Sequence, residues 1–178
     1  MASQGWRGRA LGVAAVLAVL ALAAFAVLQW TGASNAEQAR GRLAAERDLR
    51  AQVSVAAREF ARALLSYDYQ DLPAARATLA RLSTGDFMAL YDREFGAATR
   101  RSILAHKAVS QATVREVYLG EVGEATARAV VVVDSRVESG QPVREVHGSH
   151  LKLLLVREGA AWKAQEVTIL STPTPQPR

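Results

Sequence analysis

The sequence predicts an exported α+β domain behind an N-terminal transmembrane helix. Three observations predict it: an uncharged apolar run near the N-terminus, helical spacing of apolar residues from about 35 to 100, and short β-rich runs beyond His106. Half of the residues are hydrophobic, so the chain can bury a core and is not an intrinsically disordered protein. Helices followed by antiparallel strands are typical of α+β domains, in which the helices cover one face of a curved sheet.

Charge and cysteine content exclude several functional classes. The formal net charge is +5, but 17 acidic residues are mixed with 22 basic ones. This mixture does not indicate the basic groove of a nucleic-acid-binding protein, and we expect no nucleic-acid partner. The chain has no cysteine, which excludes a disulfide scaffold, a thiolate metal site and a cysteine nucleophile.

The N-terminal apolar run predicts a membrane anchor. Residues 10–28 include no charged side chain, and a membrane-spanning helix needs about 20 apolar residues. Trp6 and Trp30 flank the run, as aromatic residues do at both membrane interfaces. Arg7 and Arg9 precede it, which predicts a cytoplasmic N-terminus. The domain that follows is then extracytoplasmic.

These features predict a single-pass protein of the plasma membrane. The predicted parts are a cytoplasmic N-terminus (1–9), a transmembrane helix (10–30), a helical juxtamembrane linker (31–48), an extracytoplasmic α+β domain (49–170) and a disordered proline-rich tail (171–178). A cleaved signal peptide is the alternative, because Ser34, Asn35 and Ala36 form a small-x-small site. The apolar run is longer than the about 7–15 residues of a signal peptide, which favours a retained anchor.

Three helices are expected before the first strand. The long first helix has apolar residues three or four apart, namely Leu49, Val53, Ala56, Phe60 and Leu64. A short second helix begins after Asp71, a favoured N-cap, with Pro73 in its first turn. A capping box of Ser83 and Asp86 opens the third helix. Its inward-facing residues are expected to be Phe87, Leu90, Tyr91, Phe95 and Ala98.

Four antiparallel strands are expected to form the sheet. Turn residues separate the β-rich runs 109–119, 126–136, 143–157 and 162–170. The valines at 130–133 give the strongest strand signal, because β-branched residues favour strands. Gly148 interrupts the third run and predicts a bulge.

Three motifs carry a resemblance to known proteins. They are residues 60–68 at the end of the first helix, residues 83–87 with Tyr91 in the third, and residues 162–167 in the last strand. Their order resembles the cone-shaped fold of nuclear transport factor 2 and the SnoaL-like proteins. Behind a single membrane helix, the arrangement resembles the Mce-associated membrane proteins of actinobacterial cell envelopes, from the anchor to Leu170.

The resemblance implies an accessory or assembly subunit of an Mce-type system, which imports lipids or sterols. It implies protein–protein contacts with Mce-complex subunits or paralogous Mce-associated proteins, besides the membrane lipid bilayer. It implies no reaction and no cofactor. The same fold also occurs in enzymes such as ketosteroid isomerase and SnoaL-like cyclases. The function must therefore be inferred from individual residues and not from the fold alone.

The residues do not predict a catalytic or metal site. Asp68, Asp71 and Asp86 all lie at expected helix ends, where aspartate caps backbone N–H groups. His147 and His150 are three apart on a strand, so they point to opposite faces unless a bulge re-aims one. We therefore expect no catalytic, cofactor-binding or metal-binding residue.

Two sets of residues are candidate binding positions. Leu43 and Leu49 lie on a thin apolar stripe of the first helix, which suits a helix–helix contact with another single-span subunit or belongs to a solvated spacer. An alternative function is a lipid- or sterol-binding module with an apolar pocket in the cone. Its candidate lining residues are Phe87, Tyr91, Val131, Val133, Leu153 and Leu155. A further alternative, an exported isomerase- or cyclase-like enzyme, requires a pocket carboxylate with a raised pKa.

Overall fold

The computed structural model describes residues 37–171 and 176–177 and divides the chain into two units, Met1–Arg47 and Asp48–Arg178. In the first unit, residues 37–47 are helical and their side chains are exposed. The predicted cytoplasmic segment 1–9 and transmembrane helix 10–30 lie outside the described residues. Among the helices that are described, none has both the length and the apolarity needed to span a bilayer.

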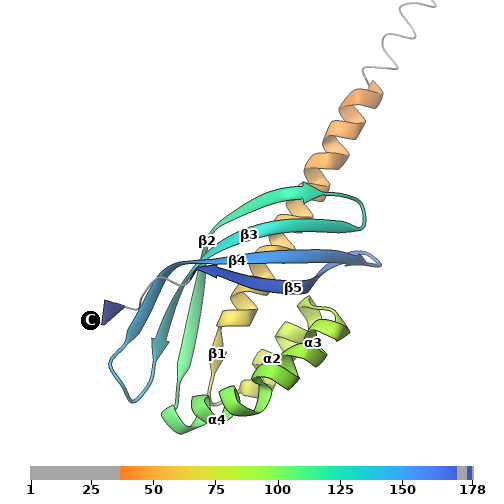
Figure 1. The fold of residues 1–178 in the computed structure, drawn as a ribbon. Helices are drawn as coiled ribbons and strands as arrows, with labels where there is room; N and C mark the ends of the chain where they lie inside the picture. Colours follow the sequence, from red (N-terminus) through yellow and green to blue (C-terminus); the bar gives the residue numbers. More distant parts are fainter. Residues whose placement is uncertain (1–36, 172–175, 178) are drawn as a thin grey trace, which may run out of the picture. The chain divides into compact units, whose positions relative to one another are not determined.

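The helices precede the four long strands, as predicted, but the short strand Tyr67–Asp68 lies before the helix Leu72–Leu82, so the prediction that three helices come before any strand is wrong (Figure 1). We call the helical residues 37–65 the long helix. The other elements are β1 (Tyr67–Asp68), α2 (Leu72–Leu82), α3 (Gly85–Tyr91), the π-helical turn η1 (Asp92–Gly96), α4 (Ala97–His106), β2 (Val109–Val122), β3 (Thr126–Glu138), β4 (Arg144–Glu158), β5 (Ala161–Ser171) and β6 (Gln176–Pro177).

The strands form one curled antiparallel sheet in the order β1-β2-β3-β4-β5, with β6 off this path (Figure 1). The four long strands were predicted, but the prediction of a four-stranded sheet is wrong. The short strand β1 pairs with the start of β2, with Tyr67 opposite Ser110. In the tail predicted as disordered, β6 pairs with Arg144–Glu145 of β4.

The predicted bulge at Gly148 is confirmed. Gly148 has a φ of +70°, which favours glycine, and the register between β3 and β4 shifts between Val133 and Ser135. The Gly148 N–H donates to Asp134 Oδ1 at 2.8 Å. The bulge therefore places the Asp134 carboxylate against the backbone of β4.

The start of α3 differs from the prediction. Thr84, not Ser83, is the N-cap, because its Oγ1 accepts a hydrogen bond from the Phe87 N–H at 3.2 Å. The buried Ser83 hydroxyl donates instead to the Leu79 carbonyl of α2 at 2.8 Å. The Asp71 cap of α2 is confirmed, with Oδ1 accepting from the Ala74 N–H at 3.1 Å.

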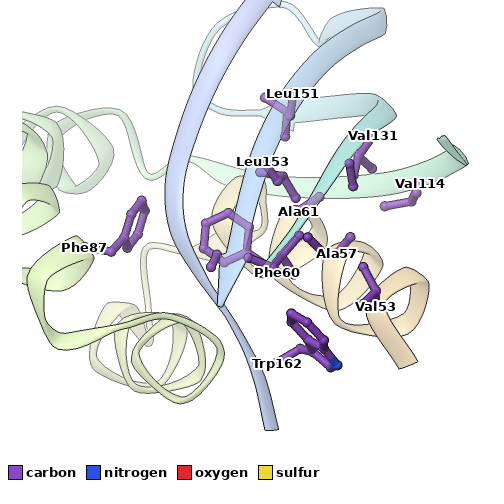
Figure 2. Close-up of a cluster of buried hydrophobic side chains, with 14 of the residues drawn as sticks. Val53, Ala57, Phe60, Ala61, Phe87, Val114, Val131, Leu151, Leu153 and Trp162 are labelled. Atoms are coloured by element: carbon purple, nitrogen blue, oxygen red, sulfur yellow. The ribbon is translucent and has the colours of Figure 1, made fainter. Parts of the chain in front are cut away.

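The core lies between the curled sheet and the part of the long helix in the second unit (Figure 2). Val53, Ala57, Phe60 and Ala61 of the helix are completely buried. They belong to the same buried cluster as alternate residues of the sheet, including Val131, Val133, Leu151, Leu153 and Leu155. Of the predicted face, Val53 and Phe60 are completely buried, whereas Leu49, Ala56 and Leu64 pack against the cluster and are only partly buried.

The inward face predicted for the third helix is only partly correct. Phe87 is buried and Tyr91 is half-buried, whereas Leu90, Phe95 and Ala98 are exposed. The helix is interrupted after Tyr91 by η1, whose π turn holds more residues than an α turn. A helical wheel drawn with 3.6 residues per turn therefore does not identify the inward-facing residues beyond Tyr91.

Candidate interaction surface

The structure brings the six candidate pocket residues together in the core. Four of them, Val131, Val133, Leu153 and Leu155, have no exposed surface, and Phe87 is buried beside them. Tyr91 packs against this cluster from its edge. Because these four aliphatic side chains are completely buried, a lipid or sterol could reach them only if the core opened.

A series of aromatic contacts runs from the core to the surface of the helical layer. Phe60 meets Phe87 edge to face with ring centroids 5.2 Å apart. Phe87 stacks on Tyr91 at 6.2 Å, and Tyr91 contacts Phe95 at 6.0 Å. Phe60 is fully buried, whereas Phe95 is 56% exposed. The surface ring is thus supported by rings that reach into the core.

The helical segment α3–η1–α4 carries further exposed apolar side chains. Leu90 is 47% exposed and Leu104 is 45% exposed. We call Leu90, Phe95 and Leu104 the helical apolar set. Apolar residues that are exposed singly are normal, but the buried centre of a protein interface is more apolar than the rest of the surface and is enriched in aromatic residues. This segment is the candidate contact surface, and two of its residues, Leu90 and Phe95, were predicted to face inward.

Desolvation by burial is the main cause that raises the pKa of Tyr91 above its usual value, and the nearby Asp92 carboxylate adds to it. The Tyr91 hydroxyl therefore stays protonated and uncharged at neutral pH. Asp92 itself is held by Arg76 of α2, whose guanidinium donates to both carboxylate oxygens. That hydrogen bond lowers the pKa of Asp92. The ion pair connects α2 to the start of η1.

The predicted partner stripe on the long helix is divided. Leu43, in the first unit, is 54% exposed. Leu49, in the second unit, is partly buried against the core. Leu43 is therefore accessible to a partner, whereas the Leu49 side chain already packs against the core of the domain.

The polar residues near the Gly148 bulge form a charged cluster on the sheet. Asp134 Oδ2 accepts from Arg115 Nε at 2.6 Å and lies 3.4 Å from His147 Nδ1. Partial burial raises the pKa of Asp134, but the hydrogen bonds from Gly148, Arg115 and His147 outweigh this effect and hold it below its usual value. The other imidazole nitrogen, His147 Nε2, lies 3.4 Å from Glu145. In this cluster the Asp134 carboxylate joins the Arg115 side chain to the backbone N–H of the bulge.

The aspartates considered as catalytic candidates do not converge. Asp68 Oδ1 accepts from the Gln70 N–H at 2.8 Å, Asp71 caps α2, and Asp86 is exposed in the first turn of α3. Within the described residues, no group of three histidine, aspartate or glutamate side chains is placed to hold a metal ion. The buried polar residues are Ser83, Thr84, Ser110 and Ser149.

No protein-family model and no curated protein matches the sequence. The fold is similar to an IcmL-like type IV secretion system protein from Legionella pneumophila, with 16% identity, a TM-score of 0.58, and coverage of 72% of this chain and 96% of that one. It is similar to the periplasmic domain of DotI, with 13% identity, a TM-score of 0.54, and coverage of 66% and 91%.

A third similar structure is CagV from Helicobacter pylori, a VirB8 homolog of the type IV secretion system. It has 14% identity and a TM-score of 0.51, and the match covers 67% of this chain and 96% of that one. None of the three is described as Mce-associated. At these identities the likeness concerns the fold, and we conclude that residues 48–171 form an α+β domain of the nuclear-transport-factor-2-like type.

Proposed function

We propose that the protein is a membrane-anchored, non-catalytic assembly subunit of a transport complex in the cell envelope. The observation that carries the proposal is the helical apolar set, Leu90, Phe95 and Leu104, about half exposed on one helical segment. Burial of such side chains in an interface removes apolar surface from water. Because Tyr91 and Phe87 support the Phe95 ring, ordering it on binding costs little conformational entropy.

The character of the buried side chains supports a non-catalytic role. Among the described residues, the buried polar ones are only serines and threonines, and no carboxylate or imidazole is buried in the core. An isomerase- or cyclase-like reaction needs such a group in an apolar pocket. The core of this domain instead consists of apolar side chains packed between helix and sheet.

The complex that we propose first is an Mce-type lipid or sterol importer, on the resemblance of the sequence to Mce-associated membrane proteins. The anchor is residues 10–30 in the plasma membrane, and the domain is extracytoplasmic. The second candidate is a secretion complex, which is favoured by the likeness in fold to the periplasmic domain of DotI and to CagV. Both candidates share the same mode of action through protein contacts.

Co-purification tests both the contact surface and the class of complex. The full-length protein is purified from a mild detergent extract of its native cells, and the associated proteins are identified by mass spectrometry. Phe95→Ser combined with Leu104→Ser should remove the associated envelope subunits. Val55→Ser is the matched control, since Val55 is 54% exposed on the long helix, outside the segment.

The proposal fails if the double variant, with an unchanged melting temperature, retains the same associated proteins as the wild type. Recovery of Mce subunits supports the lipid importer, whereas recovery of secretion-machinery proteins supports the second candidate. Loss of partners in Val55→Ser as well would show that any exposed apolar residue matters and would contradict the assignment to α3–η1–α4.

A further inference from the structure

Within the described residues, the outer edge of β2 is covered from its start to Val114. On one side β2 pairs with β3 along its length, and on the other side β1 pairs with its first two residues. The long helix and the residue after it cover the next part, because Ser66 Oγ accepts from the Ala112 N–H at 3.1 Å and Arg58 Nη1 of the helix donates to the Val114 carbonyl at 3.2 Å. Beyond Val114, no strand of the described chain pairs with this edge.

We call residues 116–120 the β2 edge segment. Register shifts with β3 lie on both sides of it, between Val114 and Glu116 and between Leu119 and Val122. Within the segment the pairing with β3 is regular from Glu116 to Leu119. An unpaired strand edge presents backbone N–H and C=O groups that can add another strand.

We propose that the β2 edge segment pairs antiparallel with the same segment of a second copy of this chain, with a two-fold axis at Tyr118. An interface between identical copies must be complementary to itself. In this register Tyr118 faces its own copy, Val117 faces Leu119, and Glu116 faces Gly120. No like charges are opposed within the segment.

The side chains support the same register on both faces of the strand. Val117 and Leu119 lie opposite Val131 and Ala129 of β3 and pack against the core, so their pairing extends the apolar face. Tyr118 points to the other face and is 57% exposed, which allows two tyrosine rings to meet across the axis. Aromatic and apolar cross-strand pairs stabilise antiparallel strands.

The residues next to the segment add complementary charge. Arg115 precedes it and Glu121 follows it, so the two ends of the segment carry opposite charges. An antiparallel second copy brings the Arg115 end of one segment to the Glu121 end of the other. Both side chains are exposed, and each makes one ion pair within its own sheet: Arg115 with the mostly buried Asp134, and Glu121 with the exposed Arg128. Opposite charges across the axis favour the second copy as the occupant of this edge.

Single-cysteine variants of the full-length protein test the register directly, since the chain has no cysteine. Directly opposed residues have Cα atoms about 4.5–5.5 Å apart, within the range of a disulfide. Tyr118→Cys should therefore form a reducible dimer under mild oxidation. Thr113→Cys is the matched control, because it is exposed on the same strand but its symmetry mate would lie about 33 Å away.

The proposal is overturned if Tyr118→Cys stays monomeric, if it cross-links to a different protein instead, or if Thr113→Cys dimerises equally well. A second pair of variants does not depend on oxidation. A Cβ added at Gly120 meets only ordinary contacts, at 3.5 and 3.6 Å, so both substitutions should fold. Gly120→Glu places a carboxylate opposite Glu116, and Gly120→Lys places an ammonium group there.

Analytical ultracentrifugation of the detergent-solubilised chain should give a dimer dissociation constant about tenfold higher for Gly120→Glu than for Gly120→Lys, because each dimer holds two such cross-strand pairs. Equal constants, or monomers for both variants and the wild type, would contradict the two-fold pairing.

Discussion

The long helix and the segment α3–η1–α4 both place aromatic residues on the same core, but they bury them to different degrees. In the long helix, Val53, Ala57, Phe60 and Ala61 are completely buried against the sheet. In α3–η1–α4, Phe87 and Met88 are buried, whereas Phe95 is 56% exposed. The comparison separates a helix whose face toward the sheet is completely buried by the fold, although Leu43 and Val55 elsewhere on it are exposed, from a helical segment whose aromatic residues extend from the core to the surface.

The largest expected effect lies in the long helix. Phe60→Ala should lower the free energy of unfolding by about 3–5 kcal/mol, because it leaves a cavity among fully buried side chains. Phe95→Ala, which removes a similar ring from the other region, should cost no more than about 0.5 kcal/mol. Urea unfolding of the two variants measures the difference, and equal losses would contradict the comparison.

Ser110→Ala should have the next largest effect, because it detaches the end of the long helix from β2. The buried Ser110 hydroxyl donates to the Leu65 carbonyl at 2.7 Å. Without it, a partly buried carbonyl loses its partner, at a cost of about 1–1.5 kcal/mol. Hydrogen exchange should rise at the last turn of the long helix and remain unchanged in α4. An increase that is uniform over both regions would mean that they unfold as one unit.

Asp134 lies in β3, outside both helical regions, so Asp134→Asn gives a stability change with which the changes in the helices can be compared. Its hydrogen bonds hold the pKa of Asp134 below the usual value, so the ionised form stabilises the fold. This stabilisation is complete above the ordinary aspartate pKa of about 3.9 and is lost as the pH falls through the lowered value. The variant should be about 1 kcal/mol less stable at pH 7, and the deficit should shrink below about pH 4. A deficit that persists at low pH would assign the effect to packing.

The smallest effect is expected for the ion pair between Arg76 and Asp92, whose side chains are 54% and 40% exposed. Exposed pairs contribute about 0–1 kcal/mol and are screened by salt. A double-mutant cycle with Arg76→Gln and Asp92→Asn should give a coupling energy in that range that falls at high salt. A coupling above about 2 kcal/mol would show that α2 and η1 are held more firmly than their exposure indicates.

Much of the fold could be predicted because its signals are local. The valines of β3, the turn residues between strands and the Gly148 bulge are visible in the sequence, and the spacing of Val53 and Phe60 identifies the buried face of the long helix. The two-residue strand β1 was missed because its pairing with Val109 and Ser110 depends on tertiary structure.

The candidate surfaces were harder to predict than the core. Leu90 and Phe95 have the spacing of inward-facing residues, and no residue type marks the π turn that follows Tyr91. The β2 edge segment was expected to end in a turn at Gly120, but β2 continues to Val122. Exposure at a sheet edge depends on which strands lie outermost, and that is set by the whole topology.

The fluorescence of Trp162 can be used to follow the state of the core, because this side chain is buried there. It is 5% exposed among the core side chains of Figure 2, and its indole N–H has no hydrogen-bond partner in the described part of the chain. An indole in such apolar surroundings emits at short wavelength, and its emission moves to longer wavelength when water reaches it. The other tryptophans, Trp6 and Trp30, precede the domain in the sequence. A truncated chain that starts after Trp30 would therefore report the opening of this core through a single fluorophore, without any added label.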